Sequence, residues 1–181
     1  MSDLAAFRRL GLVMIVATLV LDQLSKAAIL GAFGLPGGFL LPGVEPAMAH
    51  RTVTSFFNIV LAWNPGVSFG MFAGAHDLMP WILSAVAIAI SAVLLRWLWR
   101  AESAMAAAGL GMIVGGAIGN VIDRARFGAV VDFLDFHIAG YHWPAFNVAD
   151  SGITVGVALL LIDSLRQGAA TRKELQDGRR D

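Results

Sequence analysis

Four apolar stretches constrain the fold of this 181-residue chain more than any other feature. They run from about residue 10 to 30, 80 to 98, 103 to 122 and 146 to 165, and a helix needs roughly 20 residues to cross a bilayer. Charged residues make up only 14% of the chain, against about 25% in soluble domains. We therefore predict a single membrane domain over residues 1–181, an all-α polytopic membrane protein with a four-helix transmembrane bundle.

The first apolar stretch begins like a cleavable signal peptide, because Arg8 and Arg9 precede it. No cleavage pattern follows and the apolar character continues, which favours a membrane span. Asp22 and Lys26 then interrupt the span as an i,i+4 pair in the favourable order, with the acid first. This pair either neutralises itself near the membrane boundary or braces a functional site.

Residues 31–77 are predicted to leave the bilayer, since glycine and proline punctuate them too often for a long helix. Thr52–Ala62 is rich in β-branched and aromatic residues, and Val67–Phe72 follows a turn at Asn64. Two short strands are the expected structure. We predict a small extramembrane β-sheet against the membrane, with aromatic and methionine side chains facing lipid or substrate: Phe56, Phe57, Trp63, Phe69, Met71 and Phe72. Asn64 itself is more simply explained as a turn residue.

In the third span Gly111, Gly115 and Gly119 recur every four residues. One face of that helix therefore lacks side chains and can approach a neighbouring helix closely. Such packing would place Asn120 and Asp123, at the end of the span, against the partner helix.

The basic residues predict the orientation, because they concentrate on the cytoplasmic side of membrane proteins. With both termini on one side, that side holds nine of the thirteen: Arg8, Arg9, Arg96, Arg100, Arg166, Arg172, Lys173, Arg179 and Arg180. Both termini are therefore predicted to be cytoplasmic, and residues 167–181 to form a charged, mobile tail. Residues 31–77 and 123–145 would lie on the opposite side.

Four acids lie at or near a predicted hydrocarbon boundary, where a carboxylate is costly unless it is paired, hydrated or used: Asp123, Asp132, Asp135 and Asp150. Each has a simple explanation. Asp123 could pair with Arg124, Asp150 could be stabilised by a helix dipole, and the other two could be exposed loop charges. Two carboxylates that share a proton could instead activate water and protonate a leaving nitrogen. The residues alone do not say which two acids would form such a pair.

Several other kinds of chemistry find no support in the sequence. The absence of cysteine excludes thiol catalysis and cysteine metal sites, and no serine occupies a GxSxG setting. The histidines lack metal-site spacing: His50, His76, His137 and His142. Thirteen basic residues balance thirteen acidic ones, which gives no sign of a nucleic-acid partner. We expect no cofactor and no metal.

Five strings, in order along the chain, resemble the motif set of the lipoprotein signal peptidase (signal peptidase II) family: LDQLSK, NPGVSFG, GGAIGNVIDR, VVDF and FNVAD. The resemblance covers about residues 10 to 165. It implies that Asp132 and Asp150 are the catalytic aspartates. It also implies a set of supporting or substrate-binding residues: Asp22, Lys26, Asn64, Gly116, Asn120, Asp123, Arg124, Asn147 and Ala149.

The resemblance further implies an aspartyl endopeptidase of the bacterial inner membrane that removes the signal peptide from prolipoproteins. It would cut just before a diacylglyceryl-modified cysteine, at the periplasmic side, surrounded by membrane lipid and without a cofactor. We expect a monomer. A small substrate-cradling sheet and a short periplasmic helix within residues 123–145 are also implied. The alternatives are a non-enzymatic four-span protein for lipid binding or for proton- or cation-coupled transport, and a structural assembly subunit.

Overall fold

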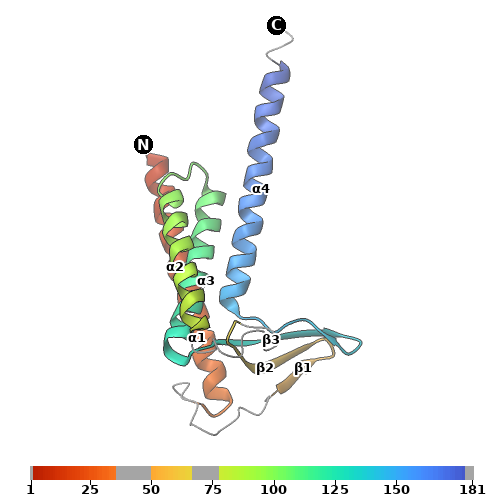
Figure 1. Cartoon of the computed structure of the whole chain (residues 1–181). Coiled ribbons are helices and arrows are strands. Elements are labelled where there is room, and N and C mark those ends of the chain that lie inside the picture. Colours follow the sequence, from red (N-terminus) through yellow and green to blue (C-terminus); the bar gives the residue numbers. More distant parts are fainter. Residues whose placement is uncertain (1, 36–49, 67–77, 178–181) are drawn as a thin grey trace.

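The computed structural model describes residues 2–35, 50–66 and 78–177. Four helices are long and apolar enough to cross a membrane, and Figure 1 shows a small sheet at one end of them. The helices are α1 (Ser2–Ala32), α2 (Met79–Leu98), α3 (Ala104–Phe127) and α4 (Val148–Asp177). The strands are β1 (His50–Thr54), β2 (Phe57–Asn64), β3 (Val130–Ile138) and β4 (Tyr141–His142).

Helix α3 is the centre of the bundle and packs against α1, α2 and α4. In its most apolar 18-residue stretch 61% of the residues are buried, against 11 to 17% in the other three helices. The outer helices instead expose valine, leucine and isoleucine side chains along their length. Exposed aliphatic surface of this extent fits a hydrocarbon environment, because lipid tails are as apolar as these side chains and their exposure to lipid carries little cost.

The glycines of α3 permit this close packing on two sides. A Cβ atom at Gly115 would lie 2.5 Å from the carbonyl oxygen of Ile15 in α1. On the other side, a Cβ at Gly116 would meet the carbonyl oxygen of Ala149 in α4. The regular glycine stripe seen in the sequence therefore faces α1, and Gly116 faces the residue before Asp150.

Gly116→Ala is expected to destabilise the protein by about 1–3 kcal/mol, the usual range for overpacking a tight contact. The new methyl group would push against backbone at Ala149 and against Ile153 Cγ1 at 3.0 Å, and so displace the start of α4. Thermal unfolding in detergent measures the loss. Gly168→Ala in α4 is the matched control, because a Cβ there meets nothing within 4 Å; equal losses in both variants would contradict the packing argument.

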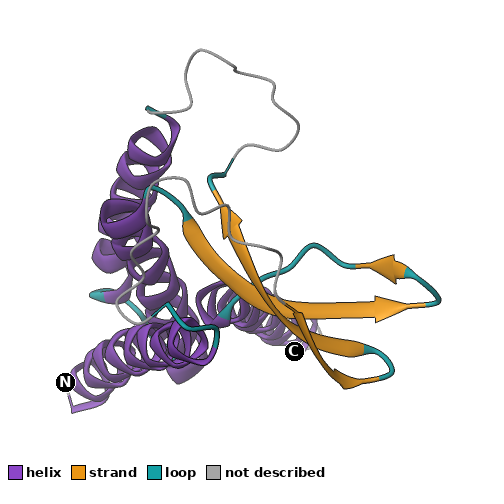
Figure 2. Ribbon diagram, turned by 90° about the horizontal axis from the view of Figure 1, so that it is seen from below, coloured by secondary structure: helices purple, strands orange, loops and turns teal. Residues whose placement is uncertain are grey.

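The sheet is antiparallel, with strand order β1-β2-β3-β4, and Figure 2 shows it extending to one side of the helices. The first hairpin turns at Ser55 and Phe56, where the Phe56 N–H donates to Thr54 Oγ1 at 3.3 Å. The prediction of one continuous strand over Thr52–Ala62 was therefore wrong, because the two halves of that stretch pair with each other. The second strand predicted at 67–72 lies outside the described residues.

The short helix implied between the third and fourth spans is also wrong. Residues 130–142 form β3 and β4 instead. The VVDFLDFHI stretch is β-branched and aromatic, which favours a strand. Ala139 and Gly140 then adopt positive φ angles of 49° and 82°, as in the two-residue turns that connect antiparallel strands.

The fourth helix is longer than the predicted span and begins at Val148. It continues as far as Asp177, so the residues after 167 that were predicted to be mobile are helical up to that point. The ATRKELQD stretch has good helix formers and no proline, which explains the continuation.

Candidate active site

A buried ionic cluster lies where α1, α3, α4 and β3 meet. The Lys26 ammonium contacts Asp22 Oδ2 at 2.8 Å and Asp123 Oδ2 at 2.7 Å, and donates to Asn120 Oδ1 at 3.1 Å. Lys26 is 2% exposed. A charge so deeply buried is tolerated only with partners, and here the partners come from two different helices.

The two acids of this cluster also bind backbone beyond their own helices. Asp22 Oδ1 accepts a hydrogen bond from the Ala149 N–H at 2.9 Å, and Asp123 Oδ2 accepts one from the Val131 N–H at 3.1 Å. The ionic cluster therefore fixes the first turn of α4 and the start of β3. Asp132 and Asp150 each follow one of these anchored residues directly.

Asp132 and Asp150 are brought together through Asn147. The Asn147 side-chain amide donates to Asp132 Oδ1 at 2.7 Å, and the Asn147 backbone N–H donates to Asp150 Oδ2 at 3.2 Å. Asn64 Nδ2 donates to the other oxygen of Asp132 at 2.9 Å, and Asn120 Nδ2 to the other oxygen of Asp150 at 2.8 Å. All four carboxylate oxygens are thus held by donors.

Asn147 and Asp150 also begin α4. The Asp150 N–H donates to Asn147 Oδ1 at 2.9 Å, so each side chain binds the backbone of the other in the arrangement of a capping box. The expectation that Asp150 sits at a helix start agrees with this geometry. Asn147 therefore caps α4 together with Asp150 and also binds Asp132.

Burial changes the acidity of Asp132, which is 2% exposed and lies in β3. Desolvation raises its pKa to about 6. The hydrogen bond from Asn64 opposes the shift, the negative charge of Asp150 adds to it, and Asn147 and Lys26 oppose it. Asp132 and Asp150 both accept hydrogen bonds from Asn147, so the two carboxylates lie within electrostatic reach of each other.

Arg124 does not form the local ion pair with Asp123 that the sequence suggested; Asp123 pairs with Lys26. The Arg124 guanidinium instead lies beside the Asn64 turn, where a Cβ at Gly66 would be 3.9 Å from Arg124 Nη2. Its Nε is buried and has no hydrogen-bond partner within residues 2–35, 50–66 and 78–177. A buried donor without a partner costs free energy, so this position favours an incoming acceptor.

Asp135 is separate from this group and is not the exposed loop charge that we considered, being 6% exposed. Its carboxylate accepts from Asn58 Nδ2 at 2.9 Å and contacts His142 Nδ1 at 2.8 Å. Burial raises the pKa of Asp135, but these hydrogen bonds outweigh burial and leave the pKa below its usual value.

Gln23 is the residue that sequence reasoning missed. Its side-chain amide donates to Asp22 Oδ2 and Asp123 Oδ1, both at 3.1 Å, and to the Gly119 carbonyl at 3.3 Å. A glutamine next to Asp22 within an apolar span was the available signal. Among the described residues no three histidine or acidic side chains are grouped to hold a metal ion.

Fold and site together define a class: a four-span membrane protein with buried aspartates gathered at the sheet end of the bundle. A sequence model of the family described as Signal peptidase (SPase) II matches residues 14–166. The chain therefore belongs to the signal peptidase II family and is an aspartic endopeptidase.

Individual relatives are similar over most of their length. The lipoprotein signal peptidase of Rhodopseudomonas palustris (strain TIE-1) is 48% identical over 164 residues, which cover 87% of this chain and 92% of that protein. That of Ralstonia nicotianae is 45% identical over 151 residues, covering 82% and 80%. A bacterial membrane enzyme solved by the in meso method at 2.3 Å resolution matches with a TM-score of 0.68 and 27% identity, covering 88% of this chain and 90% of that one.

Proposed function

We propose that the protein removes the signal peptide from diacylglyceryl-modified prolipoproteins, and that Asp132 and Asp150 form its catalytic pair. The observation that carries this proposal is the binding of both carboxylates by Asn147. The family relationship supplies the reaction class, since the relatives are lipoprotein signal peptidases.

The two aspartates have different roles in the proposed reaction. Asp132, with its pKa raised to about 6, is protonated more readily than an ordinary aspartate and serves as the proton donor. Asp150 accepts a proton from water as the water oxygen attacks the scissile carbonyl carbon. Asp132 then donates its proton to the leaving nitrogen as the C–N bond breaks. The raised pKa of Asp132 favours its role as the proton donor of the pair.

The remaining residues position this pair. Asn64, Asn120 and Asn147 hold the carboxylate oxygens, and the ionic cluster around Lys26 supports them from behind. Arg124, whose Nε has no hydrogen-bond partner among the residues that the structure describes, is suited to donate to a substrate carbonyl. Gly116 and Ala149 set the distance between α3 and α4.

The site's place in the fold supports cleavage at a membrane surface. The aspartates lie at the sheet end of helices that can span the bilayer. Asp150 is partly exposed there, which supports access for a membrane-embedded signal helix and for water. We propose that this end is periplasmic, that both termini are cytoplasmic in the inner membrane, that the cut falls just before the lipidated cysteine, and that the protein acts as a monomer.

The purified protein, incubated with a precursor that carries the diacylglyceryl cysteine, is expected to release the signal peptide. A precursor with the same sequence but no lipid should be cleaved far more slowly. Mass spectrometry of the products gives the cleaved bond. Equal cleavage of both precursors would contradict the lipid requirement, and no cleavage of either would contradict the proposed function.

Asn64→Ala is expected to move the pH dependence of this cleavage. Asn64 donates to the ionised form of Asp132 at 2.9 Å and lowers its pKa, so its removal should raise that pKa further above 6. If Asp132 must be protonated, kcat/KM falls as pH rises through that pKa, and the variant's fall should come at higher pH. A pH profile tests this. If instead the rise of kcat/KM on the acidic side moves to higher pH and the alkaline fall does not move, Asp132 is the base and the assignment of acid and base is reversed.

A further inference from the structure

The β3–β4 hairpin exposes an unusually apolar face. Side chains of opposite residues in an antiparallel pair lie on the same face, and Ile138 pairs with Tyr141. The Trp143 backbone N–H donates to the Phe136 carbonyl oxygen, so the same register continues and Phe136 lies opposite Trp143. These four side chains are 75%, 69%, 62% and 41% exposed for Ile138, Tyr141, Trp143 and Phe136 respectively.

The polarity of the hairpin is the reverse of that in a soluble protein. On its opposite face His137 pairs with His142, and their stacked rings have centroids 4.9 Å apart. The buried Asp135 is bound to His142 on this face. The Asp135 carboxylate is therefore buried and bound on one face, whereas large apolar groups are exposed on the other. An exposed apolar patch of this kind marks contact with a partner or with lipid.

The apolar face continues from the catalytic side of the sheet. Alternate residues of β3 share one face, so Asp132 is followed on that face by Leu134, Phe136 and Ile138, with exposure increasing toward the tip. An open hollow of about 460 Å³ lies at the tip, lined by Phe56, Phe136, His137, Ile138, Tyr141 and Trp143.

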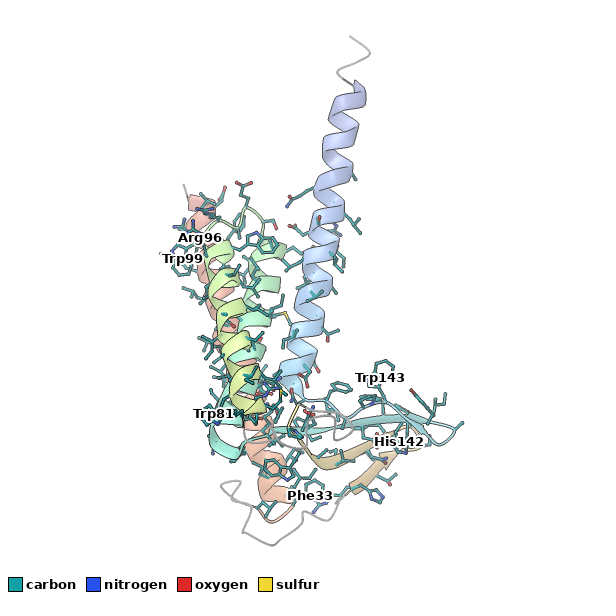
Figure 3. All side chains as sticks on the ribbon, viewed as in Figure 1. Phe33, Trp81, Arg96, Trp99, His142 and Trp143 are labelled. Atoms are coloured by element: carbon teal, nitrogen blue, oxygen red, sulfur yellow. The ribbon has the colours of Figure 1, made fainter. Side chains whose placement is uncertain are left out.

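The position of the hairpin relative to the bundle indicates which environment its apolar face contacts. Figures 1 and 2 agree that the hairpin extends beyond α4, away from the other helices. Figure 3 places Trp143 on the helix side of the hairpin and Trp81 near the start of α2, both toward the sheet end of the bundle. Trp81 and Trp99 lie 18 residues apart, roughly 27 Å along a helix, which matches a hydrocarbon core of about 30 Å.

Trp81 and Trp143 therefore mark the same membrane–water interface, where tryptophan and tyrosine concentrate. Trp143 is also only five residues before Val148, so it is within roughly 17 Å of the first residue of α4 along the chain. Beyond α4 the described protein offers nothing to cover the hairpin, and the bilayer of the spanning helices continues there.

We propose that the apolar face of the β3–β4 hairpin inserts into the headgroup–acyl boundary of the leaflet on the active-site side. Ile138 and Phe136 enter the upper acyl region, and Tyr141 and Trp143 keep their polar atoms at the headgroups. The hairpin then holds the sheet, and with it Asp132, at a fixed depth. This inference depends on the membrane spans and not on the cleavage chemistry.

Tryptophan fluorescence in vesicles tests the insertion. In a protein whose other tryptophans are replaced by phenylalanine, Trp143 is expected to be blue-shifted and to lose most of its emission when phosphatidylcholine and phosphatidylglycerol carry bromine near the top of the acyl chains. Aqueous iodide should quench it weakly. Thermal unfolding verifies that this protein is folded. The replaced residues are Trp63, Trp81, Trp97 and Trp99.

The matched control moves the single tryptophan to Thr52, on β1, with Trp143→Phe. Thr52 pairs with Asn58, which pairs with Asp135, so it belongs to the polar face and is exposed. Its tryptophan should be quenched by iodide and not by bromolipid. Equal behaviour of the two proteins would overturn the proposal. So would Trp143 emission that ignores bromolipid and shifts only with added precursor or with protein concentration, which would assign the face to substrate or to a second copy.

Discussion

Asp132→Asn is expected to reduce the cleavage rate of a lipidated precursor by about 10²–10⁴-fold, the usual contribution of a general acid or base. An asparagine keeps the shape of the side chain but cannot give its proton to the leaving nitrogen. Asp132 is held by amide donors on both oxygens, so the variant places one amide group against another. A stability loss of about 1–3 kcal/mol is expected from that mismatch, which thermal unfolding in detergent measures separately.

Asp135→Asn provides the matched control for this experiment. Asp135 lies on the same strand, is also buried, and also accepts a side-chain amide hydrogen bond. Its partner His142 is on the hairpin and not in the catalytic group. We expect Asp135→Asn to cost stability and leave kcat near normal. Near-normal cleavage by Asp132→Asn, or an equal loss in both variants, would refute the catalytic pair.

The sequence predicts the bundle well because membrane spans depend on length and hydropathy, which are local properties. It predicts the polar residues of the site for a related reason: Asp22, Lys26 and Asp123 are conspicuous within apolar helices. The ion pair of Asp22 with Lys26 was predicted and is present. The partner of Asp123 was not predicted, because Asp123 pairs with Lys26 from another helix and not with the adjacent Arg124. That choice depends on how α1 and α3 pack.

The sheet shows where local patterns are insufficient. The sequence predicted one strand over residues 52–62, but the chain turns at Ser55 and Phe56, and β2 pairs with β3. Both features depend on tertiary contacts. The register shifts between Ile59 and Ala62, next to the pairing of Ala62 with Asp132. A bulge there cannot be read from composition, and it adjusts how β2 presents Asn64 to Asp132.

Gln23 and Asn147 illustrate a similar limit within the site. Both act through side-chain amides that connect separate elements, and amides carry no charge that draws attention in a sequence. Asn147 was one of several polar residues expected near the ends of the spans, and a family motif contains it, but its hydrogen-bond partners were not predicted. Its three simultaneous roles, toward Asp132, Asp150 and Asn120, follow from the meeting of β3 and α4.

Lys26→Met is expected to have the largest effect on stability, a loss of about 3–5 kcal/mol, because it leaves buried carboxylates without their cation. Asp22 and Asp123 are 0% and 1% exposed, so water cannot replace the ammonium. Thermal unfolding in detergent is the measurement, and Arg9→Met, at an exposed site on the same helix, should change little.

Neutralising the whole cluster tests whether the stability loss in Lys26→Met comes from unpaired buried charge. Asp22→Asn and Asp123→Asn keep acceptors for the Ala149 and Val131 N–H groups, so adding both to Lys26→Met removes the unpaired charges and leaves these anchors. The triple variant should therefore be more stable than Lys26→Met alone. If it is less stable, uncompensated charge is not the main cost of Lys26→Met. Because Asp22 and Asp123 anchor the residues next to Asp150 and Asp132, a triple variant that folds but cleaves slowly would show that the ionic cluster sets the geometry of the catalytic pair.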